Sequence, residues 1–99
     1  MELIKHNENE KVIISASGRI DTNTAPAFEA EIKECIAECS ELVLDFAGVE
    51  YISSAGLRVL LTTHKTMLKK GGSLKIINVA GEIMDIFDIT GFSTVLNIE

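Results

Sequence analysis

The spacing of hydrophobic residues changes several times along the chain, and each change marks a predicted element. A weak strand candidate at residues 3–6 and a β-branched run at residues 12–16 are separated by a polar stretch, and together they predict an antiparallel hairpin. From Thr24 the period becomes helical, because Phe28, Ile32 and Cys35 continue through Ile36 and Cys39 as one apolar stripe. Thr24 offers an N-cap oxygen to this helix, and Pro26 suits its first turn.

The second half of the chain repeats this alternation of strand and helix. Residues 42–46 are almost continuously apolar, which is typical of a strand covered on both faces. After a short predicted loop, a helical stripe is made by Leu57, Leu60, Leu61, His64 and Leu68. Gly71 and Gly72 can end this helix. The pattern then predicts a strand at residues 74–77, a short helix at 82–90 and a last strand at 95–98.

The predicted order is ββαβαβαβ, an α/β fold in one domain over residues 1–99. Strands joined by helices pair in parallel with right-handed crossovers, so the hairpin should lead into a mainly parallel sheet. A chain of 99 residues can bury one core, and no linker or repeat divides it.

Composition narrows the classes of function. With 46% hydrophobic and 24% charged residues, the chain matches ordinary globular proteins. Its net charge of −6 and its low aromatic content of 5% argue against nucleic-acid binding. No apolar run is long enough for a membrane span, and the polar start is not a signal peptide. Cys35 and Cys39 match neither a disulfide framework nor a metal motif, so we expect core residues of a reduced, cytoplasmic protein.

The charges are unevenly distributed between the two longer predicted helices. The first is acidic, with four glutamates between residues 29 and 38 and a single lysine among them. The second is basic, with Arg58, Lys65, Lys69 and Lys70. A solvated face is the usual cause of such a pattern, but it could also steer a partner of opposite charge.

The segment at residues 42–61, LVLDFAGVEYISSAGLRVLL, carries the most functional information. Its predicted strand and loop lead to Ser53 and Ser54 at the start of a helix. A single serine there caps the helix, which is worth about 1 kcal/mol. A pair of serines followed by Ala55 and Gly56 exceeds what a cap needs, and these small residues would leave the helix end open to another protein.

Enzymatic readings of these serines lack the necessary partners. A nucleophile elbow needs glycine two residues before the serine, where this chain has Ile52. His64, on the apolar stripe of the same helix, is badly placed to act as a base for Ser54. No phosphate loop motif is present, and His6 and His64 have no ligands at metal spacing, so we assign no catalytic residue, metal or cofactor.

These residues resemble the STAS domain of the bacterial anti-sigma factor antagonists. The family pattern runs from a strand ending in Asp to a serine and a glycine that open a helix, and it is matched by Asp45, Gly48, Ser54, Gly56 and Leu57. A second family signature resembles Gly18-Arg19-Ile20-Asp21. The resemblance covers essentially the whole chain, and it implies a β-α superhelix with strands in sequential order.

The resemblance implies a regulatory binding protein that is switched by phosphorylation. Ser54 matches the serine that a partner kinase phosphorylates, and Asp21 matches an acidic residue near it. The unmodified form would bind an ATP-dependent anti-sigma factor serine kinase and free the sigma factor, and a metal-dependent serine phosphatase would reset the modified form. Ser53 stands where the family often has Asp, which leaves it open as a second acceptor.

The expected partner surface combines Asp21 with the start of the helix, namely Ser53, Ser54, Ala55, Gly56 and Arg58. Both segments follow the carboxyl ends of strands, which share one edge in a parallel sheet. Arg58, one turn after Ser54, could pair with a phosphate or be an ordinary solvated arginine. We expect a monomer that contacts neither nucleic acid nor membrane directly. The alternative is a STAS-type accessory or scaffold subunit, in a lipid-transport or stress-signalling assembly, whose serine is not phosphorylated.

Overall fold

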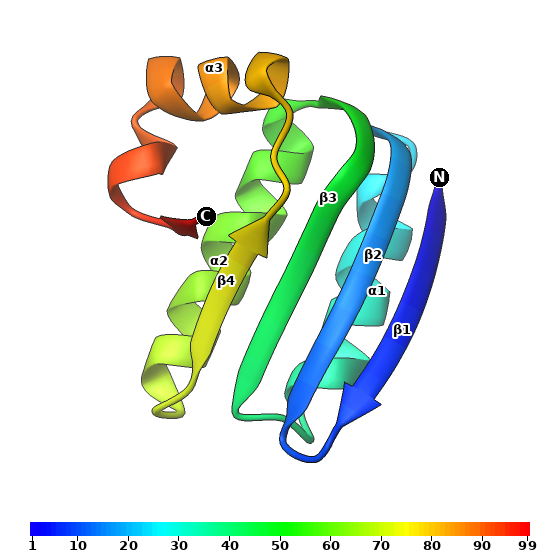
Figure 1. The fold of residues 1–99 in the computed structure, drawn as a ribbon, viewed down its shortest axis with the longest axis vertical. Coiled ribbons are helices and arrows are strands. Elements are labelled where there is room, and N and C mark those ends of the chain that lie inside the picture. The colour runs from blue at the N-terminus through cyan, green and yellow to red at the C-terminus, as the bar shows by residue number, and fades with distance from the viewer.

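The computed structural model describes residues 1–99 and contains one five-stranded sheet with strands in the order β1-β2-β3-β4-β5 (Figure 1). The elements are β1 (Glu2–Glu8), β2 (Lys11–Ile20), α1 (Ala25–Ile36), β3 (Glu41–Ile52), α2 (Ser54–Lys69), β4 (Ser73–Ile77), α3 (Gly81–Thr90), a 3₁₀ turn (Phe92–Thr94) and β5 (Asn97–Ile98). β1 and β2 pair antiparallel and the other neighbours pair in parallel. The predicted α/β fold, its hairpin and its sequential strand order are therefore confirmed.

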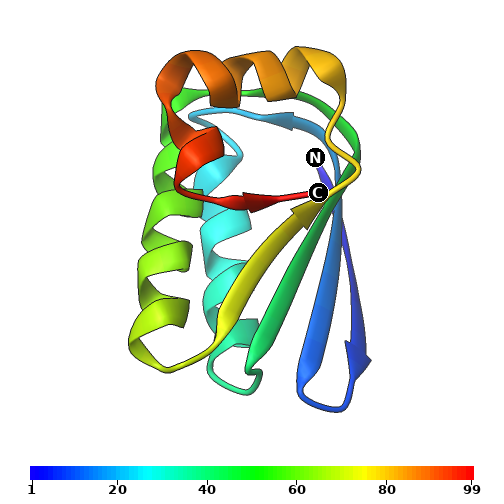
Figure 2. The ribbon, with the colours of Figure 1, turned by 60° about the vertical axis from the view of Figure 1, so that its left-hand side comes forward.

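Helices cover only one face of the sheet. α1 and α2 lie side by side against that face, while α3 crosses the end where the parallel strands terminate (Figures 1 and 2). The core between sheet and helices holds 23 buried residues, and Phe28, Phe46 and Phe87 are its largest fully buried side chains. β2 and β3 end beside the starts of α1 and α2, and the candidate site lies there. No helix is both long and apolar enough to cross a membrane.

The predicted loop after residue 46 is wrong, because β3 continues as a strand to Ile52. Its pairing with β2 shifts twice: Ser15 and Ser17 face Asp45 and Gly48, and a second shift follows Gly18. β3 therefore carries extra residues, which interrupt the alternation of apolar and polar positions that marks a strand in sequence. Gly48 permits this, since a Cβ there would lie 2.7 Å from the Ser17 Cβ.

The predicted buried stripe of α2 is wrong in part. Leu57 and Leu60 are buried as expected, but the inward face is completed by Gly56, Val59, Thr63 and Met67. Leu61 and His64 are only half-buried, and Leu68 is 60% exposed. Thr63 enters the core because its hydroxyl donates a hydrogen bond to the Val59 carbonyl oxygen, 2.7 Å away.

Two other predicted boundaries also differ from the structure. α1 ends at Ile36, so Cys39 lies beyond the helix, although it remains buried. The last strand is limited to Asn97–Ile98, because the chain after Gly91 first makes the 3₁₀ turn and leaves Val95 exposed. Gly91 ends α3 with a left-handed φ of 82°.

Candidate functional site

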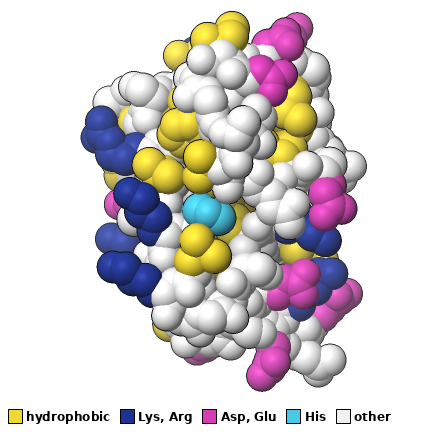
Figure 3. Space-filling model, turned by 90° about the vertical axis from the view of Figure 1, so that its left-hand side faces the viewer, with side chains coloured by type: hydrophobic (Ala, Val, Ile, Leu, Met, Phe, Trp, Pro, Cys, Tyr) yellow, Lys and Arg dark blue, Asp and Glu magenta, His cyan; other side chains and the backbone are white.

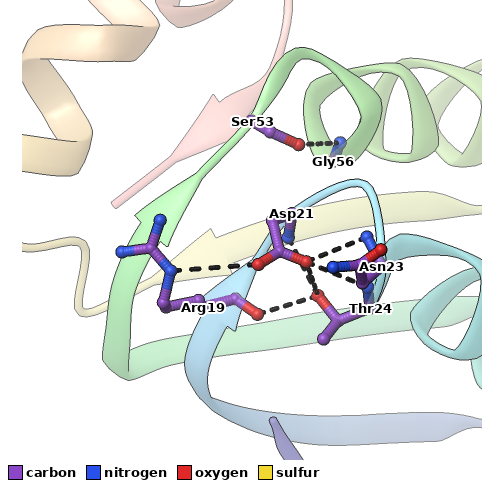
Figure 4. Close-up of polar contacts among 6 residues, drawn as sticks. All are labelled: Arg19, Asp21, Asn23, Thr24, Ser53 and Gly56. Atoms are coloured by element: carbon purple, nitrogen blue, oxygen red, sulfur yellow. Dashed lines mark hydrogen bonds and ion pairs between the residues drawn. The ribbon is translucent and has the colours of Figure 1, made fainter.

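The turn after β2 and the start of α2 lie beside each other at one edge of the sheet (Figure 4). Ile20 and Ile52 are paired at the ends of their strands, and the Ser53 N–H donates to the Ile20 carbonyl oxygen at 2.8 Å. This contact brings Asp21, the residue after Ile20, next to the serine pair. The predicted shared edge for Asp21 and Ser54 is confirmed.

The two serines occupy different environments. Ser53 is the N-cap of α2, with extended backbone, and its Oγ accepts a hydrogen bond of 3.3 Å from the Gly56 N–H. Ser54 is the first helical residue; it is exposed, and its hydroxyl has no hydrogen-bond partner within the protein. Ser53 therefore caps α2, and the Ser54 hydroxyl is free to accept a covalent modification.

Asp21 organises the turn that leads into α1. Its Oδ1 accepts from the N–H groups of Asn23 at 3.0 Å and Thr24 at 3.1 Å, and its Oδ2 lies 3.8 Å from Arg19 Nε (Figure 4). The backbone hydrogen bond from Thr24, followed by the smaller contributions of Asn23 and Arg19, holds the pKa of Asp21 below its ordinary value. The carboxylate is therefore ionised and fixed in orientation.

The predicted side-chain cap at Thr24 is wrong. Thr24 occupies the N-cap position of α1 without a capping hydrogen bond. Its hydroxyl instead accepts from the Asp21 N–H and donates to the Arg19 carbonyl oxygen, each at 2.8 Å. Because Asp21 already supplies an oxygen to the Thr24 N–H, the Thr24 hydroxyl is left to brace the turn.

Arg19 and Tyr51 are features of this edge that the sequence analysis did not single out together. The Arg19 guanidinium carbon lies 4.3 Å from the centre of the Tyr51 ring, on the neighbouring strand. Tyr51 is 37% exposed, although it is a large aromatic residue. The sequence pattern places Tyr51 in a predicted loop, and only the pairing of β2 with β3 brings these two residues together.

Ala55 and Arg58 line a shallow groove between the starts of α1 and α2. The groove has a volume of about 230 Å³, and its other lining residues are Thr22, Ala25, Pro26, Glu29, Val59 and Thr62. Arg58 is exposed and makes no ion pair, so its guanidinium is free to meet an anion.

Gly56 has a different role from the one its small size suggested. It is buried, and a Cβ at this position would lie 2.7 Å from both Ile20 Cγ2 and Ile52 Cγ1. Glycine therefore lets the first turn of α2 pack directly on the ends of β2 and β3. Its smallness serves internal packing, whereas Ala55 is half-buried and faces the groove.

Asp45 and the two cysteines have structural surroundings. Asp45 Oδ1 accepts from the Ala47 N–H at 3.0 Å and from Asn78 Nδ2 at 3.1 Å, so it shapes β3 where the register shifts. Cys35 and Cys39 are buried and free, as predicted for core residues, and burial raises the pKa of both thiols. No three His, Cys, Asp or Glu side chains are grouped so that they could hold a metal ion.

Comparisons of sequence and of structure with known proteins point to the same group of relatives. The model of the STAS domain family matches residues 2–99. The anti-sigma-B factor antagonist of Bacillus subtilis (strain 168) is 33% identical over 95 residues, which cover 96% of this chain and 86% of that protein. An anti-sigma factor antagonist from Mycobacterium paratuberculosis, known from a crystal structure, has a TM-score of 0.88 and 26% identity, with 98% of this chain and 83% of that one covered.

A further solved relative has been determined in two states. The anti-sigma factor antagonist SpoIIAA in its unphosphorylated form has a TM-score of 0.79, and 99% of this chain and 87% of that one are covered. The phosphorylated form of the Bacillus protein has a TM-score of 0.78, with 99% and 91% covered. Each is 16% identical to this chain, so the likeness is one of fold.

Proposed function

Because this chain belongs to the STAS domain family, we propose that it is an anti-sigma factor antagonist. In this proposal its unphosphorylated form binds an anti-sigma factor serine kinase and thereby releases a sigma factor. The relative in Bacillus subtilis carries the same function in its name and aligns over almost the whole chain. The chain then acts as a binding protein and as a substrate, and it is not itself an enzyme.

Phosphorylation of Ser54 switches this binding off. The observation that supports this assignment is the difference between the two serines. Ser53 caps α2, whereas the Ser54 hydroxyl is exposed and makes no hydrogen bond within the protein. In the transfer step the Ser54 Oγ forms a bond to the γ-phosphorus of ATP as the bond to ADP breaks, and a base of the kinase takes up the hydroxyl proton. A metal-dependent phosphatase would hydrolyse the product to serine and inorganic phosphate.

The folded domain tolerates this modification for electrostatic reasons. Ser54 is the first residue of a 16-residue helix, whose N-terminus has unpaired N–H groups and a partial positive charge. Arg58, one turn further on, carries an unpaired guanidinium that can approach the phosphate. SpoIIAA has this fold in both its unphosphorylated and phosphorylated forms, which supports a switch without refolding.

The proposed partner surface consists of the same residues that the sequence suggested, and these residues have different roles in it. Ser54, Ala55 and Arg58 contact the partner, since they are exposed or line the groove. Asp21 and Ser53 hold the edge in shape through their hydrogen bonds and present their remaining polar atoms. Gly56 contributes by setting how closely α2 approaches the sheet.

Phosphorylation by a cognate kinase tests the function. The chain is incubated with ATP and an anti-sigma factor serine kinase from its source organism, and the phosphate is located by mass spectrometry. We expect modification of Ser54 in the wild type, none in Ser54→Ala, and continued modification of Ser54 in Ser53→Ala. Phosphate on Ser53 would refute the assignment of the site. Failure of every such kinase to bind or modify the chain would favour the accessory or scaffold alternative.

A further inference from the structure

One line of outward-facing residues runs along α2 from the proposed phosphorylation site. It consists of Ser54, Arg58, Leu61, Lys65 and Leu68, at alternating spacings of four and three residues. A mean spacing of 3.5 residues keeps side chains on one side of a helix. These five residues are called the α2 stripe below, and they extend about 21 Å along the helix at 1.5 Å per residue.

The core does not use the α2 stripe. The inward face of α2 is made by other residues, and of the stripe only Leu61 is even half-buried. Leu68 is 60% exposed, so most of its apolar side chain makes no contact within the fold. Figure 3 faces this side of the molecule and shows hydrophobic side chains next to a group of Lys and Arg side chains.

The charge of this face is opposite to that of the chain. The chain has a net charge of −6, yet α2 contains Arg58, Lys65 and Lys69 and no acidic residue. None of these three cations takes part in an ion pair. The neighbouring helix behaves differently, since its Lys33 lies 3.9 Å from Glu29. The two leucines of the α2 stripe lie among unpaired cations, and this arrangement is complementary to a partner surface that is both apolar and acidic.

We propose that the α2 stripe docks an acidic amphipathic helix of the anti-sigma factor. Apolar side chains of that helix lie against Leu61 and Leu68, and its carboxylates face Arg58, Lys65 and Lys69. This inference rests on the proposed function and gives the switch a partner chemistry. A phosphate on Ser54, at the end of the stripe, repels the partner's nearest carboxylate and competes with it for Arg58.

The geometry favours a protein helix over other occupants. The apolar part of the stripe is a single file of two leucines, which is too narrow for insertion into a bilayer. A second copy could offer its acidic α1, but α1 exposes no large hydrophobic residue to meet Leu61 and Leu68. A helix packed along a 3.5-residue repeat can satisfy both the leucines and the cations.

Binding measurements on charge-reversed variants test the proposal. The affinity for the kinase that modifies Ser54 is measured by titration calorimetry at low and at physiological salt. We expect Lys65→Glu with Lys69→Glu to weaken binding about tenfold at low salt, and less at higher salt. The matched control combines Lys5→Glu with Lys33→Glu, which gives the same net charge outside α2 and should change affinity by about twofold or less. Leu68→Ser should weaken binding at both salt concentrations, and its exposure predicts unchanged stability.

The outcomes separate this inference from the function on which it rests. If the kinase modifies Ser54 but binds both double variants equally, the docking surface is wrong and the function stands. If no anti-sigma factor kinase binds the wild type, the function fails and the docking surface fails with it. Binding to vesicles of phosphatidylglycerol, or self-association in sedimentation, that is lost in the α2 variant would assign the stripe to another occupant and overturn the proposal.

Discussion

Ser53 and Ser54 carry the same hydroxyl group, and their different roles come from the backbone conformation, which changes from extended to helical between them. Ser53 is still extended, so its Oγ can turn back to the Gly56 N–H, whereas Ser54 is already helical and its side chain faces solvent. A cap stabilises the helix only while its oxygen accepts that hydrogen bond. Phosphorylating the cap would therefore disturb the fold, while phosphorylating its neighbour leaves the cap intact.

Replacement of each serine by alanine should separate these duties. Ser53→Ala removes the oxygen that accepts from Gly56 N–H, and we expect a loss of about 1 kcal/mol of unfolding free energy. Ser54→Ala is the matched control and should stay within about 0.5 kcal/mol of wild type, because its hydroxyl has no partner. Urea denaturation at neutral pH measures both. A larger loss at Ser54 than at Ser53 would contradict the assignment of the cap.

Asp21 should give the fold a measurable dependence on acid. Its pKa is lowered in the folded state, so its contribution to stability is present above the unfolded pKa of about 3.8 and is lost as the pH falls through the folded value. Asp21→Asn keeps an acceptor oxygen but removes the charge. We expect the variant to be less stable than wild type at pH 7, with the difference narrowing at about pH 3.

Urea midpoints at the two pH values test the role of Asp21. Asp85→Asn, on the exposed surface of α3, is the control for removing a carboxylate that holds no turn. A difference between Asp21→Asn and wild type that is independent of pH would mean that the charge of Asp21 does not stabilise the turn.

At the scale of elements, α2 depends on close contact between its first turn and the sheet. Gly56→Ala would place a Cβ 2.7 Å from side-chain carbons of both Ile20 and Ile52, and we expect a loss of about 1–3 kcal/mol from this overpacking. Gly81→Ala, at the start of α3, is the control because nothing lies within 4 Å of its Cβ, and it should be neutral or slightly stabilising. Thermal denaturation measures the stability of both variants. An equal loss of stability in Gly56→Ala and Gly81→Ala would contradict the packing argument.

The elements also show where sequence patterns succeed and fail. Helices and strands were predictable because their apolar periods differ, and the shared edge of Asp21 and Ser54 follows from parallel pairing. The buried face of α2 was predicted wrongly because Leu61 and Leu68 are apolar but belong to the outer stripe. The end of β3 was mistaken for a loop because its extra residues interrupt the alternation. Which serine caps α2 depends on the residue at which β3 ends, and the spacing of hydrophobic residues does not reveal that residue.

At the scale of the molecule, the fold places an acidic helix and a basic helix beside each other. α1 and α2 lie on the same face of the sheet, one rich in glutamate and the other in lysine and arginine (Figure 2). The starts of both helices meet at the edge that carries Asp21 and Ser54. A phosphate on Ser54 would therefore add negative charge at the end of the basic helix nearest Arg58, outside the core, and we expect it to act without a change in the sheet.

The phosphomimetic variant Ser54→Asp should separate electrostatic exclusion from refolding. An aspartate at the first position of α2 suits the helix dipole, so we expect stability equal to wild type or slightly higher. Affinity for the anti-sigma factor kinase should fall, though less than after phosphorylation, because aspartate carries one charge and phosphate nearly two. If repulsion dominates, the loss shrinks as salt rises, since exposed charges are screened within about 8 Å at physiological ionic strength.

Titration calorimetry across a salt series, with Ser54→Asn as the uncharged control of similar size, measures this screening. Ser54→Asn should bind almost as wild type does at every salt concentration, because it adds bulk without charge. If Ser54→Asn loses as much affinity as Ser54→Asp, steric exclusion at the start of α2 accounts for the switch. If Ser54→Asp melts well below wild type, the modification acts through the fold, and the charged surface of α2 is not its target.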